Sequence, residues 1–142
     1  MKKQDYDHAR EEFRKDAEVE PDLGLDYEKL GDLYWLTQKD VDAEKCYQEA
    51  LRRDPRLVNS HVGLAKLYQR QQKYSLALQE ALAAEKIDPE RSDVHYLHSR
   101  VLLQMGRKDE AKKEMNEAQR IERDHQNQVP GVPSPELLQD AQ

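Results

Sequence analysis

A spacing of 34 residues recurs along most of this chain and constrains its fold more than any other feature. Four sets of positions keep this spacing: Ala9, Ala43, Ala77 and Ala111; Pro21, Pro55 and Pro89; Ala50, Ala84 and Ala118; Tyr34, Tyr68 and Leu102. A fixed period of this size is typical of one small structural unit copied in tandem, in which each copy packs mainly on its neighbours. The chain is therefore expected to present an extended binding surface rather than a catalytic centre.

Each period predicts a pair of helices. Large residues recur at helical spacing from Tyr27 to Trp35, a polar break follows at 37–40, and a second stripe runs from Ala43 to Leu51. Pro55 disfavours helical backbone at the residue before it, so the second helix should end there. Alanines in the stripes are small enough for two helices to cross closely. The pattern predicts an antiparallel helix pair in every period.

The unit resembles the tetratricopeptide repeat, a helix–turn–helix with the pattern W-x2-L-G-x2-Y, then A-x3-F, then A and P. The first copy has Tyr27, Leu30, Gly31, Tyr34, Ala43, Tyr47, Ala50 and Pro55 at these positions. The second copy has His61, Leu64, Ala65, Tyr68, Ala77, Ala81, Ala84 and Pro89. The third departs further from the pattern, with His95, His98, Ser99, Leu102, Ala111, Met115 and Ala118, and with Arg123 in place of the proline.

The resemblance extends from Asp5 to Arg123 and implies an all-α fold, a right-handed superhelical solenoid of antiparallel helix pairs. We expect about three and a half repeat units. Residues 1–21 would form the second helix of a partial repeat, and residues 22–125 would hold three repeats at approximately 24–57, 58–91 and 92–125. Residues 126–142 contain prolines and a glycine and predict a flexible C-terminal tail.

Composition argues against several classes of function. The net charge of −6 disfavours general nucleic-acid binding, which requires a basic surface. No apolar run approaches the roughly 20 residues that cross a bilayer. The N-terminus has no apolar signal core, so a cytoplasmic location is favoured if the chain is complete. Cys46 is the single cysteine, which rules out an intramolecular disulfide and favours a structural or surface role.

The sequence predicts neither an enzyme, nor a cofactor, nor a metal site. It contains no glycine-rich phosphate loop and no nucleophile elbow. His95 and His98 are three apart on one predicted helix face, and His61 is the repeat equivalent of His95. Zinc requires three or four ligands, and no cysteine or acidic partner stands out at a repeated position. We therefore expect these histidines to lie in the core or at an interface.

In tetratricopeptide repeats the first helices line a concave groove, and the resemblance places the partner-binding residues of this chain there. The groove is mixed, and aromatic and arginine side chains are the types that dominate interface energetics. Its apolar anchors would be Trp35, Val62, Tyr96 and Leu97. For Trp35, packing against the previous helix pair is an equally weighted alternative. The predicted contact residues are Glu28, Lys29, Asp32, Trp35, Val62, Lys66, Gln69, Arg70, Tyr96, Leu97 and Arg100.

Two known subclasses of the family do not match these positions. The repeats that clamp the C-terminal carboxylate of chaperones use Lys, Asn and Arg at sites occupied here by Glu28, Asp32, Gly63, Asp93 and Leu97. Three of these five are acidic, so an anionic C-terminus should be repelled. The asparagine ladder of the O-GlcNAc transferase array is also missing, because its sites correspond to Lys29, Gly63 and Leu97.

The sequence thus predicts a non-catalytic protein-interaction module that captures a partner peptide or helix on its concave face. The alternative is a self-assembly or regulatory segment of a larger protein that carries an enzymatic domain elsewhere.

The ends of the chain leave further alternatives open. The predicted helix at 5–19 lacks the first helix of its own repeat, so the chain is either a fragment of a longer array or a native end with an exposed apolar face. Such a face predicts a homo-oligomer through this orphan helix, or cover by the 135–141 segment. That segment itself predicts either a disordered tail or a short helix that docks on a groove.

Overall fold

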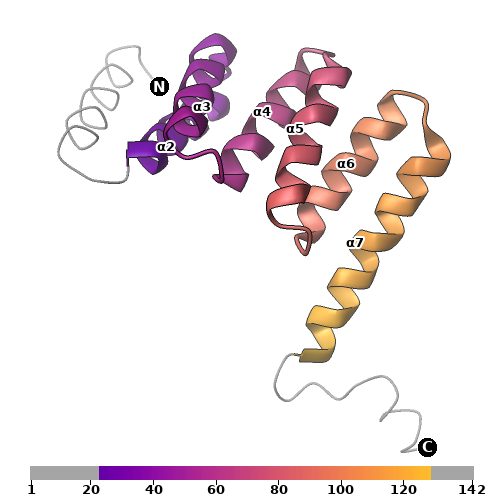
Figure 1. The fold of residues 1–142 in the computed structure, drawn as a ribbon. Coiled ribbons are helices and arrows are strands. Elements are labelled where there is room, and N and C mark those ends of the chain that lie inside the picture. Colours follow the sequence, from indigo (N-terminus) through magenta and orange to yellow (C-terminus); the bar gives the residue numbers. More distant parts are fainter. Residues whose placement is uncertain (1–22, 129–142) are drawn as a thin grey trace, which may run out of the picture. The chain divides into compact units, whose positions relative to one another are not determined.

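The computed structural model describes residues 23–128 of the 142-residue chain, and these residues form helices without any strand. The helices are α2 (Leu23–Leu36), α3 (Asp40–Arg53), α4 (Val58–Arg70), α5 (Tyr74–Ile87), α6 (Ser92–Gln104) and α7 (Lys108–Gln128). They make three consecutive pairs, α2–α3, α4–α5 and α6–α7 (Figure 1). The all-α repeat fold predicted from the sequence is therefore confirmed.

The chain divides into two compact units, one ending at Asp88 and the other beginning at Pro89. In the first unit α2 packs against α3 and α4 packs against α5, and α4 also contacts both helices of the preceding pair. Alanines lie where the helices pack closely, and none of the following has any exposed surface: Ala43, Ala50, Ala77, Ala81 and Ala84. A larger side chain at these points would separate the helices or strain the packing, which explains why the small residues recur with the period.

The second unit consists of the pair α6–α7. Its core is made of small and branched apolar side chains from both helices, and Ala111 and Ala118 repeat the alanine contacts of the first unit. The fully buried side chains of this core include Val94, Val101, Leu102 and Ile121. The hydroxyl of Ser99 is buried as well and donates a hydrogen bond to the carbonyl oxygen of Ala111 at 2.9 Å, which ties α6 to α7.

The turns inside the three pairs share one backbone conformation. Gln38, Gln72 and Gly106, which are one period apart, all have positive φ angles, of 61°, 61° and 79°. In each turn the following residue donates its N–H to a carbonyl five residues earlier, as Lys39 does to Tyr34 at 2.9 Å and Lys73 to Tyr68 at 2.8 Å. This is the Schellman ending of a helix, which satisfies carbonyls that would otherwise lack a partner.

Helix ends follow the prolines where the prolines are present. α3 and α5 end at Arg53 and Ile87, two residues before Pro55 and Pro89. In the third repeat Arg123 replaces the proline, and α7 continues past Ile121 to Gln128. The flexible tail was predicted to begin at residue 126, so the helix extends three residues into it. Nothing at this point removes a backbone donor or disfavours helical backbone, which is the physical reason for the longer helix.

Two groups of predictions lie outside the described residues. These are the partial repeat at 1–21, with its orphan helix at 5–19, and the segment at 135–141. Among helices α2 to α7, none is long and apolar enough to cross a membrane.

Candidate functional site

The residues predicted to contact a partner differ widely in exposure. The charged groups at the surface are Lys29, Asp32, Lys66, Arg70 and Arg100. Trp35, Gln69 and Tyr96 are partly buried. Glu28, Val62 and Leu97 are buried, with exposed fractions of 8%, 9% and 4%. The buried members contribute to the fold, so the surface offered by these positions is mainly polar, with Trp35 and Tyr96 as its aromatic members.

In the first unit, the predicted contact residues come from two adjoining helices. Lys29, Asp32 and Trp35 are spaced three apart along α2. Along α4, Gln69 and Arg70 follow Lys66 by three and four residues, so each set lies on one side of its helix. Because α2 contacts α4, these two rows of side chains belong to neighbouring helices. These two adjoining helices carry eight of the eleven predicted residues, and six of the eight are exposed or partly buried.

Trp35 and Arg70 form the fixed aromatic part of this surface. The guanidinium carbon of Arg70 lies 3.7 Å from the centroid of the Trp35 ring, which is a close cation–π contact. The same guanidinium pairs with the carboxylate of Asp40 at the start of α3. Trp35 therefore contacts α4 of the following helix pair and remains partly accessible beside a charged group, whereas the alternative of packing on the previous helix pair falls on residues outside the described range.

Tyr47 explains why glycines occur where α2 and α4 approach α3. Its side chain is 1% exposed, and a Cβ atom added at Gly31 or Gly63 would lie 2.8 or 2.4 Å from the ring. Only glycine leaves room for the ring at both positions. The Tyr47 hydroxyl donates a hydrogen bond to Oδ1 of Asp32 at 2.5 Å. Burial first, and then this carboxylate, raise the pKa of Tyr47 far above its ordinary value.

Other acidic groups of the first unit are also bound by hydroxyls. The Ser60 hydroxyl donates to Oε2 of Glu28 at 2.7 Å in a buried contact between α4 and α2. The Tyr68 hydroxyl donates to Oε1 of Glu44 at 2.9 Å, and burial together with this bond raises the pKa of Tyr68 to about 12. Glu28 is thus a buried structural carboxylate, although the sequence placed it among the partner contacts.

In the second unit the predicted contact residues separate. Leu97 is buried, whereas Arg100 is exposed on α6. The Tyr96 hydroxyl donates to Oε2 of Glu122 at 2.9 Å, and this carboxylate raises the pKa of the phenol. Glu122 lies in the part of α7 that continues beyond the ordinary end of the repeat, so the longer helix helps to hold Tyr96.

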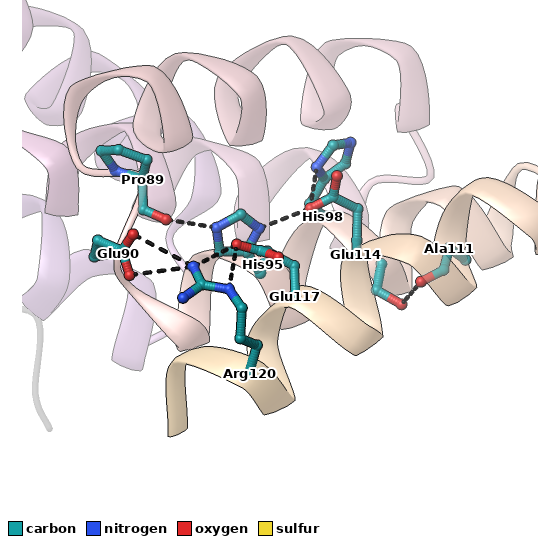
Figure 2. A network of polar contacts seen from close by, with 9 residues as sticks. Pro89, Glu90, His95, His98, Ala111, Glu114, Glu117 and Arg120 are labelled. Atoms are coloured by element: carbon teal, nitrogen blue, oxygen red, sulfur yellow. Dashed lines mark hydrogen bonds and ion pairs between the residues drawn. The ribbon is translucent and has the colours of Figure 1, made fainter. Parts of the chain in front are cut away.

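Sequence analysis missed a polar contact that occurs in two repeats. Nδ1 of His61 lies 2.7 Å from Oε2 of Glu80, and its Nε2 lies 3.1 Å from the carbonyl oxygen of Pro55. One period later, Nδ1 of His95 lies 2.7 Å from Oε2 of Glu114, and its Nε2 lies 2.7 Å from the carbonyl oxygen of Pro89 (Figure 2). The statement that no acidic partner stands at a repeated position is wrong.

The signal for this contact was present in the sequence. In both repeats a glutamate follows the histidine by 19 residues, and a proline precedes it by six. In the first repeat Tyr27 and Cys46 occupy the histidine and glutamate positions, so the pattern has only two copies. Its members belong to different helices, and a search for ligand spacing on one helix face could not find them.

In the second unit, further charges surround the same carboxylate. Nδ1 of His98 lies 3.3 Å from Oε2 of Glu114, so this one carboxylate contacts two histidines of α6, His95 and His98 (Figure 2). Beside them, Arg120 of α7 contacts Glu117 at 2.5 Å and Glu90 at 3.4 Å. His95 and His98 are 4% and 7% exposed. These contacts fasten the start of α6 to α7 and leave little of either histidine at the surface.

A family model described as the tetratricopeptide repeat matches residues 27–57 and 92–125. The two matches coincide with the pairs α2–α3 and α6–α7. This chain contains tetratricopeptide repeats. The pair α4–α5 between them has helices of 13 and 14 residues, close to the 14 and 14 of α2–α3, and it has the same turn conformation at Gln72, so it completes the series.

Solved structures of similar fold support this assignment. A crystal structure of MamA matches with a TM-score of 0.75 and 18% identity over 90% of this chain and 70% of that chain. The translocator chaperone SycD of Yersinia enterocolitica matches with a TM-score of 0.68 and 21% identity, over 87% of this chain and 89% of that chain. The first repeat domain of Spaghetti (RPAP3), bound to an HSP90 peptide, matches with a TM-score of 0.68 and 20% identity, over 70% of this chain and 79% of that chain. At these identities the likeness concerns the fold, and no curated protein matches the sequence.

Proposed function

We propose that this chain is a non-catalytic protein-interaction module that captures a peptide or helix of a partner protein. The single observation that carries the proposal is the paired surface of α2 and α4, where exposed Lys29, Asp32 and Lys66 accompany the Trp35–Arg70 stack. Side chains that are fixed before binding lose less conformational entropy when a partner arrives. Arg70 and Asp32 are fixed in this way, by Asp40 and Tyr47.

The chemistry of this surface favours a partner segment with both charges over one with an anionic end. The exposed side chains of α2 and α4 carry both signs, with Lys29, Lys66 and Arg70 positive and Asp32 negative. A chaperone-type C-terminal peptide such as the SRMEEVD bound by the RPAP3 domain would meet the exposed carboxylate of Asp32, and it would find no cation at the Glu28 position, where the clamp needs polar or cationic donors. We therefore expect no measurable binding of that peptide.

Peptide selection followed by affinity measurements would test the proposal. A displayed library of random peptides is selected on the chain, and a selected peptide is titrated against Trp35→Ala and Lys66→Glu. Trp35→Ala should weaken binding by roughly 30-fold, as loss of a hot spot does, while circular dichroism stays helical. Lys86→Glu is the matched control, because it makes the same charge change at an exposed position of α5.

The outcomes separate the possibilities. Affinity that falls in both α2 and α4 variants and stays in the control supports capture on this surface. Equal affinity in all three variants would place binding elsewhere and contradict the proposal. Failure of the whole library to yield a binder would contradict it too, and binding of SRMEEVD at wild-type strength would overturn the predicted charge preference.

A further inference from the structure

His61 stands between two hydrogen-bond acceptors. Its Nδ1 faces a carboxylate oxygen of Glu80 on α5 at 2.7 Å, and its Nε2 faces the carbonyl oxygen of Pro55 in the connection between α3 and α4 at 3.1 Å. An ionised carboxylate and a carbonyl can accept hydrogen bonds but cannot donate them. The two contacts therefore join three segments of the first unit only if both ring nitrogens carry a proton.

This requirement fixes the number of protons at the site. A neutral imidazole has one N–H and can serve one of the two acceptors, whereas the imidazolium serves both. The extra proton belongs on the imidazole rather than on the glutamate, because the ordinary pKa of histidine is the higher one. The geometry thus points to a charged histidine paired with a charged glutamate inside the repeat.

The groups around the pair favour the same state. Glu80 is the charged group that contacts His61 within the described residues, and its hydrogen bond is the largest cause of a raised pKa for His61. Burial acts in the opposite direction, and the Pro55 carbonyl adds to the rise. Further away, the Tyr68 hydroxyl lies near Glu80 and is bound to Glu44 of α3, and it stays neutral because its pKa is about 12.

The arrangement is repeated one period later, which shows that it is not an accident of one rotamer. His95 contacts Glu114 and the carbonyl of Pro89 in the second unit, and each of these residues follows its counterpart by one period (Figure 2). Both histidines occupy the first turn of the first helix of their repeat. Each therefore fastens the entry of its repeat to the repeat's second helix.

We propose that the His61 imidazolium holds the start of the second repeat in place through its two hydrogen bonds, and that loss of its proton as the pH rises releases one of these bonds and loosens the start of α4. Either Pro55 or Glu80 then lacks a donor. The direction follows from the raised pKa of His61: the stabilisation is fully present below pH 6.5, and it is lost as the pH rises through the folded-state value.

Glu80→Gln tests this role of the His61 proton without removing the two contacts. The glutamine amide can donate to Nδ1 of a neutral imidazole while Nε2–H still donates to Pro55, so both hydrogen bonds survive without the extra proton. The His61 titration is followed by NMR of the ring carbons, together with hydrogen-exchange protection of the Ser60 and His61 amides, which donate to the Leu57 carbonyl. Protection is corrected for the intrinsic pH dependence of exchange.

In the wild type we expect the midpoint for His61 to lie above 6.5, and protection at the start of α4 to fall through that midpoint. In Glu80→Gln the midpoint should lie below 6.5, and protection should no longer fall as the pH rises past 6.5. Glu49→Gln is the matched control, since Glu49 contacts Arg52 and Arg53 rather than a histidine, and it should behave as wild type.

A wild-type midpoint at or below 6.5 would overturn the proposal even if the variant failed to fold. An unchanged midpoint in Glu80→Gln would also overturn it. A raised His61 midpoint without any loss of amide protection at the start of α4 would show that His61 binds the proton but that the proton does not stabilise the helix start, which would also contradict the proposal.

Discussion

The first repeat and the later two are held together by different means, although their backbones follow the same period. In the first repeat a tyrosine ring fills the space between helices, with Gly31 and Gly63 making room for Tyr47. In the second and third, a histidine in the first turn is bound to a glutamate and a proline carbonyl. The comparison shows that small residues and turns set the positions of the helices in all three repeats. The contacts that then hold the helices together can be either close packing, as around Tyr47, or ionic hydrogen bonds, as at the histidines.

The two means should respond differently to substitution and to pH. Packing around a buried ring such as that of Tyr47 loses stability when a single methyl group is added or removed, because protein interiors are close-packed. The same packing does not depend on pH. An imidazolium–carboxylate pair is sensitive to protons and less sensitive to volume. Each prediction below tests one side of this contrast.

The largest effect is expected from removal of the Tyr47 ring. Tyr47→Ala should destabilise the chain by about 3–5 kcal/mol, since it deletes a fully buried ring and leaves a cavity. Chemical denaturation followed by circular dichroism measures this change. Tyr47→Phe is the control, because it keeps the ring and loses only the bond to Asp32, at about 0.5–1.5 kcal/mol. A loss below 1 kcal/mol for the alanine variant would show that the ring does not hold the helices together.

A smaller loss is expected when the space for the ring is narrowed. Gly63→Ala places a Cβ atom 2.4 Å from the ring of Tyr47, so it should destabilise by about 1–3 kcal/mol through overpacking. Helix propensity alone predicts the opposite, a gain of about 1 kcal/mol. The sign of the change in unfolding free energy therefore decides between contact and propensity. Adding Tyr47→Leu should restore part of the loss if the two positions are coupled.

The smallest effect concerns the turns, which the repeats share. Gln72→Gly should stabilise the chain by up to about 1 kcal/mol, because glycine accepts the positive φ angle of 61° at lower cost. Gly106→Ala should destabilise by about 1 kcal/mol from backbone strain alone, since nothing lies within 4 Å of the added Cβ. Thermal melts of the two variants should shift in opposite directions. Shifts of the same sign would contradict a common turn geometry.

Much of the fold could be predicted from the sequence, because period, small residues and helix breakers act locally. The alanine spacing identified the helix contacts, and Pro55 and Pro89 marked the ends of α3 and α5. The helix α7 was predicted too short. The missing proline at Arg123 was recognised, but the polar sequence after it was interpreted as linker, whereas backbone hydrogen bonds continue to Gln128.

The candidate site was less predictable, because exposure and pairing depend on residues of other helices. Val62 and Leu97 were predicted as apolar anchors, and their burial could be known only from packing. The bond between Glu28 and Ser60 spans 32 residues, and that between His61 and Glu80 spans 19. Neither spacing corresponds to a pattern on one helix. The assignment of the groove residues to a partner stays a prediction.

NMR mapping of a bound peptide tests the central claim most directly, namely that a partner binds on the paired surface of α2 and α4. The isotope-labelled chain is titrated with a library-selected peptide, and chemical-shift changes and peptide-to-protein contacts are assigned. The proposal predicts the largest changes at Lys29, Trp35 and Lys66, with contacts from the peptide to the Trp35 ring. Contacts confined to the exposed side chains of α3 and α5, with the Trp35 ring unchanged, would contradict it.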